Sequence, residues 1–206
     1  MPRPTQNLAN ELVSHIRYID QTRRKVETLF SQNLIVARDI NFVYSGLFLE
    51  LVTSFEKFIE DLFAGMLSNL LTHPSRNIRP RIIFNSPSVC RDIIRGDRNY
   101  VDWLPYDITI KRSTAFFRNG LPFTNLTIQE KAVLKKISWI RNAIAHKSNH
   151  SFSVFENNVI AGLPLTPIER TPIGYLRSIY INFPVSQRRF EEIASEIINI
   201  SNTLVS

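Results

Sequence analysis

Cysteine and glycine are both scarce in this sequence of 206 residues. The single cysteine, Cys90, rules out any disulfide within the chain. No apolar run approaches the roughly 18 residues that a membrane-spanning helix needs. The N-terminal stretch is polar and mixed in charge, without the pattern of a targeting segment, so we expect a cytosolic protein. The six glycines, set against long apolar periodicity, favour helices.

The charge of the chain is basic, with 25 Lys and Arg residues against 18 Asp and Glu residues and a net charge of +7. Apolar residues make up 44% of the chain and charged residues 21%, which is typical of a globular protein and not of a disordered one. A basic surface favours contact with a polyanion, although the same balance also suits a protein that is basic for no specific reason. Charge alone therefore leaves both interpretations open.

Apolar residues at helical spacing predict four long helices. The first covers residues 8–30, and the second covers residues 41–74, where a proline disfavours helix in the residue before it. The third, over residues 127–147, opens with the Thr-x-x-Glu spacing of a capping box, and the last covers residues 185–205. We therefore predict an all-α fold, a single bundle of four to five main helices over residues 1–206.

Proline-rich segments separate these helices at residues 74–106 and 150–184. The first segment is rich in arginine and contains a candidate short helix capped by Ser86. Another short helix is expected around residues 108–117. The second segment is expected to be an irregular excursion before the last helix, with a small hairpin in "NNVIAGLPLTP".

Several kinds of catalytic site lack support in the sequence. The histidines are scattered, and only His146 and His150 stand four residues apart, with no obvious third ligand for a metal. No glycine-rich phosphate loop is present, so we predict no metal and no cofactor. The arginines around Cys90 would lower the pKa of its thiol if it were exposed, but a structural thiol is the simpler interpretation.

The stretch "SWIRNAIAHKSNH" places Arg141, Asn142 and His146 among apolar residues. On a regular helix, residues five apart differ by about 140° in direction and about 7.5 Å in height, so Arg141 and His146 cannot share one stripe. Either the helix loosens near His146, or a second copy of the chain supplies the missing neighbour. The alternative is structural: an Arg paired with a carboxylate, and a His that interacts favourably with a helix C-terminus.

The motif "RNAIAH" resembles the Arg-x4-His motif of the HEPN superfamily (higher eukaryotes and prokaryotes nucleotide-binding domains). The upstream stretch "LELVTSFEKFIEDL" is similar to the early helix of the RiboL-PSP branch of that superfamily. The order of a long helix pair, a variable middle, the motif helix and a terminal helix covers most of the chain. The resemblance implies an all-α bundle that dimerises and acts as a metal-independent endoribonuclease, leaving a 2′,3′-cyclic phosphate.

The same resemblance implies roles for three residues. Arg141 would hold the scissile phosphate, His146 would act as general acid or base, and Asn142 would orient the phosphate or brace the His. The implied partners are RNA, a second copy of the chain, and an antitoxin or defence-system protein. Some HEPN toxins carry a modifiable Tyr two residues past the His, where this chain has Ser148, which argues against that class of antitoxin.

Two further groups of residues are predicted to support the site. Glu56 lies at the border of the apolar stripe of the second helix, where its carboxylate could reach Arg141, unless it is a solvated surface residue. The residues predicted to contact RNA phosphates are Arg91, Arg95, Arg98 and Lys147.

Three aromatic residues close to the arginines in sequence are candidates for stacking on unpaired bases. They are Tyr100, Trp103 and Tyr106. The alternative is that the aromatics belong to the core and the arginines form a solvated face.

Two other functions remain open at this point. The first is a non-catalytic HEPN-like module that binds RNA, nucleotide or a partner protein. The second is a helical scaffold in which the motif is a coincidence. A binding module has no need of His146, so the motif favours the endoribonuclease, acting as a toxin or defence effector.

Overall fold

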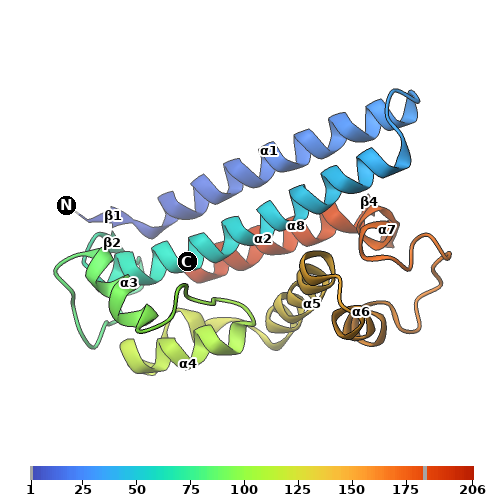
Figure 1. Cartoon of the computed structure of the whole chain (residues 1–206). Helices are drawn as coiled ribbons and strands as arrows, with labels where there is room; N and C mark the ends of the chain where they lie inside the picture. Colours follow the sequence, from blue (N-terminus) through green and yellow to red (C-terminus); the bar gives the residue numbers. More distant parts are fainter. Residues whose placement is uncertain (1, 183–184) are drawn as a thin grey trace. The chain divides into compact units, whose positions relative to one another are not determined.

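The chain is mostly helical in the computed structural model, which describes residues 2–182 and 185–206. The described part contains eight α-helices (Figure 1): α1 (Thr5–Ser31), α2 (Ala37–Leu67), α3 (Pro87–Arg95), α4 (Tyr106–Phe116), α5 (Ile128–His146), α6 (Asn149–Phe155), α7 (Pro172–Arg177) and α8 (Arg189–Val205). The predicted all-α class is confirmed. The predicted number of four to five main helices is wrong, because the proline-rich segments themselves fold into short helices.

The helix caps explain why the short helices form. Ser86 precedes α3 and its hydroxyl accepts a hydrogen bond from the backbone N–H of Val89, as the sequence predicts for a capping serine. Pro87 occupies the first turn of α3, where its missing N–H is not needed. A Thr before α7 caps that helix in the same way, again with a proline in the first turn. Prolines that break long helices therefore also begin short ones.

Four short strands and three minor helices complete the described secondary structure. β1 (Arg3–Pro4) pairs in parallel with β2 (Leu71–Thr72), and β3 (Ile179–Asn182) pairs antiparallel with β4 (Val185–Arg188). The minor helices are η1 (Arg118–Gly120), η2 (Phe123–Asn125) and the π-helical η3 (Glu156–Ile160).

Two local predictions are wrong in this part of the chain. The hairpin expected in "NNVIAGLPLTP" is absent, because α6 continues directly into η3. An antiparallel pair of strands, β3 and β4, is present later in the chain, where "IYIN" has the β-branched and aromatic composition of a strand. The last helix consequently begins at Arg189, after β4, and not at residue 185.

The chain divides into two compact units. The first unit comprises Met1–Val13, Ser54–Lys135 and Ile197–Ser206, and the second comprises Ser14–Thr53 and Lys136–Glu196, among the residues described. Helices α1, α2, α5 and α8 each contribute residues to both units. The prediction of a single domain over residues 1–206 stays a prediction.

Aromatic side chains form the core of the first unit. The ring of Phe63 lies 5.2 Å from Trp103, 5.1 Å from Phe117 and 5.2 Å from Phe123, centroid to centroid. All of these side chains are buried. Such edge-to-face and tilted pairs each contribute about 0.5–1.5 kcal/mol beyond their burial. The cluster holds the Pro-rich middle of the chain against the second half of α2.

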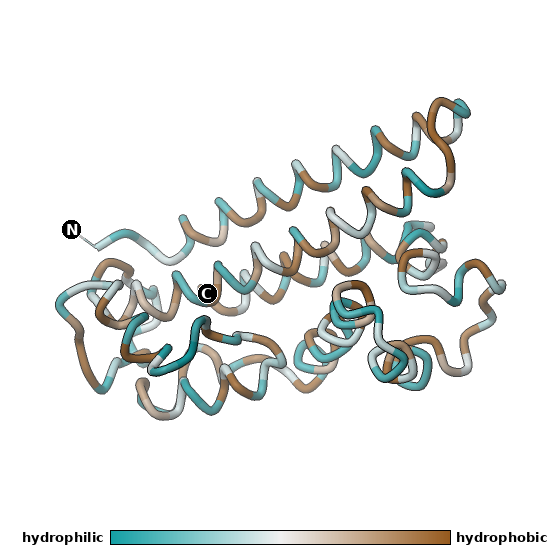
Figure 2. The backbone as a smooth tube through the Cα atoms, viewed as in Figure 1, coloured by the Kyte–Doolittle hydropathy of each residue, from teal (hydrophilic) through white to brown (hydrophobic). Residues whose placement is uncertain are grey.

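The second unit combines an aromatic core with a buried ionic network. Tyr44 and Phe48 of α2 both contact the ring of Phe190, at centroid distances of 5.7 and 6.2 Å. The Tyr44 hydroxyl donates to Glu27 over 2.6 Å, and burial raises the pKa of Tyr44 to about 12. Figure 2 shows hydrophilic and hydrophobic residues alternating along α1, the helix that supplies Glu27. Glu27 is half-buried, so its carboxylate needs partners.

Arg23 is the most buried charge of that network. Its side chain is 3% exposed, and its guanidinium pairs with Asp20 and Glu191. Arg24 contacts the same two carboxylates, but its side chain is 66% exposed. Two neighbouring arginines therefore share partners at very different depths.

Two glycines of the second unit give a matched test of the packing. A Cβ at Gly174 would lie 2.0 Å from the backbone oxygen of Ile168, whereas a Cβ at Gly46 in α2 would meet nothing within 4 Å. We expect Gly174→Ala to destabilise the protein by about 1–3 kcal/mol through overpacking. Gly46→Ala should stabilise it by about 0.5–1 kcal/mol through helix propensity. Urea unfolding curves check both values, and equal effects of the two substitutions would contradict this description of α7.

Candidate functional site

The motif helix α5 is regular up to His146 and stops there. Lys147 follows with φ of +48°, a left-handed conformation that ends the helix. Ser148 then caps α6, with reciprocal hydrogen bonds between Ser148 and Ser151. The helix therefore ends at His146 and does not continue past it in a loosened form.

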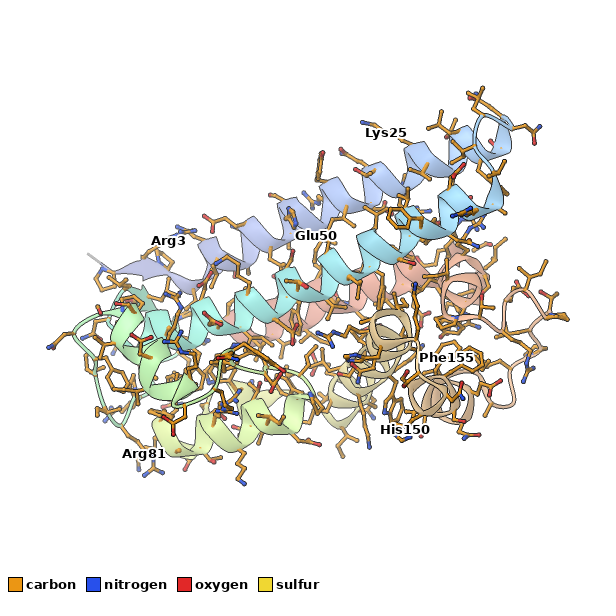
Figure 3. The ribbon with its side chains drawn as sticks, viewed as in Figure 1. Arg3, Lys25, Glu50, Arg81, His150 and Phe155 are labelled. Carbon is orange, nitrogen blue, oxygen red and sulfur yellow. The ribbon has the colours of Figure 1, made fainter. Side chains whose placement is uncertain are left out.

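The end of α5 also separates the two histidines that stand four residues apart in the sequence. His146 and His150 lie on different helices, so their spacing of four residues does not bring them onto one helical face. His150 is exposed on α6 while Phe155 of the same helix is buried, and Figure 3 labels both side chains. Among residues 2–182 and 185–206, no cluster of three or more His, Cys, Asp or Glu side chains could hold a metal ion.

Asn142 connects the two ends of the motif. Its Oδ1 accepts a hydrogen bond of 3.2 Å from Nη1 of Arg141. Asn142 also lies one helical turn before His146, so the two side chains share a stripe of α5. Arg141 and Asn142 are half-buried, and His146 is exposed in the last turn of the helix. The regular helix thus groups all three residues through Asn142, although Arg141 and His146 themselves diverge.

Within the described part of the second unit, Arg141 donates to the amide oxygen of Asn142 and makes no ion pair with a carboxylate. The structural alternative for Arg141, a buried ion pair, therefore has no support inside this unit. A guanidinium has several N–H donors, and Asn142 accepts from Nη1. Such a group is suited to an anionic ligand.

Glu56, the predicted partner of Arg141, is half-buried in α2 and belongs to the first unit. Arg141 belongs to the second unit. The pairing of these two residues stays a prediction.

The arginines predicted to bind RNA already have intramolecular partners in the first unit. Arg91 pairs with Glu60 over 2.8 Å and with Asp61 over 2.6 Å, and so fastens α3 to α2. Arg95 pairs with Asp92 in its own helix.

Arg98 donates to two carbonyl oxygens at the end of α3, at 3.2 and 3.3 Å, which is a common role of a basic residue after a helix. Arg91 is the least available to a phosphate, because its guanidinium lies between two carboxylates. Arg95 and Arg98 are both exposed, so they keep surface available for RNA, and their role stays a prediction.

Lys147 is different from these arginines. It is exposed, directly follows His146, and has no side-chain partner among the residues described. Among the four basic residues predicted to contact RNA, Lys147 is the one that lies next to the motif.

Two of the three aromatics proposed for base stacking are core residues. Trp103 is 2% exposed and donates to Glu60, and Tyr106 is 3% exposed and donates to the carbonyl oxygen of Phe123. Their role in base stacking is therefore wrong. Tyr100 is 70% exposed and remains available.

Cys90 is a structural thiol. Its side chain is buried in α3, and burial raises the pKa of the thiol to about 11, although Arg91 acts in the opposite direction. A thiol with that pKa is almost fully protonated at neutral pH and is a poor nucleophile.

The sequence did not indicate a pocket that lies beside the motif. This pocket, of about 450 Å³, is entirely within the second unit. It is lined by Asn41, Ser45, Ala143, Ile144, Lys147, Ser148, Asn149, Phe152, Thr171, Pro172 and Ile173. Three of these residues belong to the motif helix or follow it directly. Lys147 lines this pocket in a left-handed conformation, and a Lys gives no sequence signal for such a turn.

The chain was compared with family models, with curated proteins and with solved structures. None of them matches. Any functional argument therefore rests on the residues of this chain and on their geometry. None of the helices in the described residues has both the length and the apolar character needed to cross a membrane.

Proposed function

We propose that this chain is a metal-independent endoribonuclease of the HEPN type, with Arg141, Asn142 and His146 as its catalytic residues. The observation that carries the proposal is the hydrogen bond between Arg141 and Asn142, one turn before the exposed His146. A cation, an orienting amide and an imidazole then stand together at one end of α5. Relationship to the HEPN superfamily is part of the proposal.

The reaction uses a nucleophile that the RNA itself provides. His146, as a neutral imidazole, accepts the proton of a ribose 2′-hydroxyl, and the 2′-oxygen attacks the adjacent phosphorus. The bond from phosphorus to the 5′-oxygen breaks, and that oxygen takes up a proton. The products are a 2′,3′-cyclic phosphate and a 5′-hydroxyl. Arg141 binds the phosphate and stabilises the negative charge that builds up on its oxygens.

A homodimer completes the site in this proposal. The reaction needs a base for the 2′-hydroxyl and an acid for the leaving oxygen, and each chain offers one His in the motif. A second copy, related by a two-fold axis, supplies the second His146. A toxin or defence effector with an antitoxin or defence-system partner is the biological setting that fits such an activity.

The pocket beside the motif favours one other candidate function. A cavity of this size, next to an unpaired lysine, also suits a non-catalytic HEPN-like module that binds nucleotide, RNA or a partner protein. Such a module would bind its ligand without cutting it.

An RNA cleavage assay in excess EDTA tests the proposal. We expect the purified chain to cut single-stranded RNA with EDTA present, because neither Arg141 nor His146 needs a metal to act. The 3′ fragments should carry 5′-hydroxyls, detected as direct labelling by polynucleotide kinase. The 5′ fragments should resist labelling at their 3′ ends until acid opens the cyclic phosphate and a phosphatase removes the resulting monophosphate. Intact RNA after prolonged incubation, or cleavage only with added metal, would contradict the proposal.

A further inference from the structure

The pocket of the second unit is large enough for one small organic ligand. Its volume of about 450 Å³ lies within the range of roughly 300–1,000 Å³ that is usual for such sites. Its walls come from α2, α5, α6 and the start of α7. These elements all belong to one compact unit, so the pocket does not depend on the placement of the other unit.

The apolar part of the pocket suits a flat ring. Ala143, Ile144, Pro172 and Ile173 supply aliphatic surface, and Phe152 supplies an aromatic ring. Phe152 is 38% exposed, and its ring lies 6.1 Å from that of Phe155, which is fully buried. A half-exposed aromatic that is fixed from behind is an effective stacking surface, because little side-chain freedom remains to be lost.

Some of the polar groups that line the pocket already form hydrogen bonds within the chain, and others do not. The hydroxyls of Ser148 and Thr171 cap α6 and α7, and Asn41 Oδ1 accepts a hydrogen bond from Arg177. The carboxamide of Asn149 and the ammonium of Lys147, by contrast, have no partner among the residues that the structure describes. The unused groups are therefore an amide, which both donates and accepts, and a cation.

The backbone at Lys147 supports a functional role for this cation. A non-glycine residue in the left-handed region is uncommon, and glycine or asparagine usually occupies this position after a helix. Residues held in sparsely populated conformations occur preferentially at ligand sites. Here the conformation places a positive charge at the pocket and directly after His146.

We propose that this pocket binds one nucleotide of the RNA strand, next to the scissile phosphate. The base stacks on Phe152, the Asn149 amide hydrogen-bonds the edge of the base, and Lys147 binds a phosphate. The inference rests on the proposed function for the identity of the strand. Ala143 and Ile144 of the pocket lie between Asn142 and His146 in the sequence, and α5 rises only about 1.5 Å per residue, so the pocket and the catalytic residues lie at the same level along the axis of α5. The pocket would then set a base preference at the position beside the cut.

Binding of nucleoside monophosphates to the full-length chain tests the pocket without requiring cleavage. AMP, GMP, CMP and UMP are titrated separately by calorimetry, with ribose 5-phosphate and inorganic phosphate as controls for the phosphate alone. We expect one or two of the four to bind at least tenfold more tightly than either control, since stacking adds to the phosphate contact.

Matched substitutions locate the binding. Phe152→Ala should weaken it about tenfold or more, while Phe42→Ala, at a residue of the same unit that is 82% exposed and outside the pocket, should have no effect. Lys147→Gln should weaken binding and reduce its salt dependence, whereas Lys25→Gln, at another exposed lysine, should not. Asn149→Ala should reduce the difference between bases, and it changes an exposed side chain without a partner, so misfolding does not confuse the result.

The outcomes separate this inference from the proposed function. If no monophosphate binds better than ribose 5-phosphate, or if Phe152→Ala binds as tightly as Phe42→Ala, the nucleotide pocket is refuted even when the chain cuts RNA. If the monophosphates bind as expected but RNA stays intact in EDTA, the pocket stands and the nuclease function fails. If the wild type cuts with a base preference beside the cut and Asn149→Ala retains that preference unchanged, the placement of the base is wrong.

Discussion

Replacing His146 by alanine is expected to lower the rate of RNA cleavage by about 10²–10⁴, the usual contribution of a general acid or base. Arg141→Ala should have an effect of similar size, because it removes the group that stabilises the charge on the phosphate. The measurement is the single-turnover rate on a labelled RNA in EDTA, at saturating protein. Single-turnover conditions exclude product release as the step that is observed.

His150→Ala is the matched control for this prediction. His150 is exposed, lies four residues after His146, and belongs to α6 and not to the motif helix. It should cut at the wild-type rate. Cleavage by His146→Ala at the wild-type rate, in a preparation free of contaminating nuclease, would exclude the mechanism.

Light scattering on the same preparations should give about twice the chain mass of 23.9 kDa for the wild type and for each variant. An active monomer would contradict the shared site.

Arg23→Ala should destabilise the protein by about 3–5 kcal/mol, the range observed when one partner of a buried ion pair is removed. Arg23 is 3% exposed and sits between Asp20 and Glu191, which would be left partly buried and without their main counter-charge. Arg24 still reaches both carboxylates from the solvent side, so we expect the lower end of that range. Urea unfolding at neutral pH measures the change.

Arg24→Ala is the control for this second prediction. It removes the same charge, one position along α1 and from the same two carboxylates, but its side chain is 66% exposed. Exposed ion pairs contribute about 0–1 kcal/mol. Burial and not charge therefore distinguishes the two variants, and equal losses of stability would show that the network at Arg23 is not buried as described.

The sequence predicted those features of the fold that depend on neighbouring residues, namely helix caps and long amphipathic helices. The capping box at Thr127 and Glu130 is present, with Thr127 N donating to Glu130 over 2.7 Å and Glu130 N donating to Thr127 over 3.1 Å. The cap at Ser86 and the long amphipathic helices are likewise present. Periodicity and capping act over a few residues, so a single sequence contains the information they need.

The errors arose where contacts distant in sequence decide the outcome. Trp103 follows several arginines and resembles a stacking residue, but Phe63, forty residues earlier in the chain, buries it. Residues 185–188 were expected to begin the last helix, but pairing with β3 makes them a strand. The pocket is lined in part by Lys147 in a left-handed conformation, which no pattern of residue types predicts.

Part of the local geometry around Arg141, Asn142 and His146 follows from the sequence. The spacing of Arg141, Asn142 and His146 in the sequence places them on one helix. The same spacing brings Asn142 close to His146. The hydrogen bond from Arg141 to Asn142 depends on a rotamer and could not be read from the sequence. The pairing partners of Arg91 were also hidden, because Glu60 and Asp61 lie about thirty residues away from it in sequence.

The single buried cysteine gives the protein a built-in reporter of its own opening. Cys90 is inaccessible in the folded first unit, and a thiol reagent can reach it only when α3 detaches from the core. The rate of labelling therefore measures the free energy of that local opening, in the way that hydrogen exchange does for backbone amides. No second cysteine exists in the chain to confuse the signal. Substitutions in the second unit can thus be examined for their effect on the first without introducing any probe.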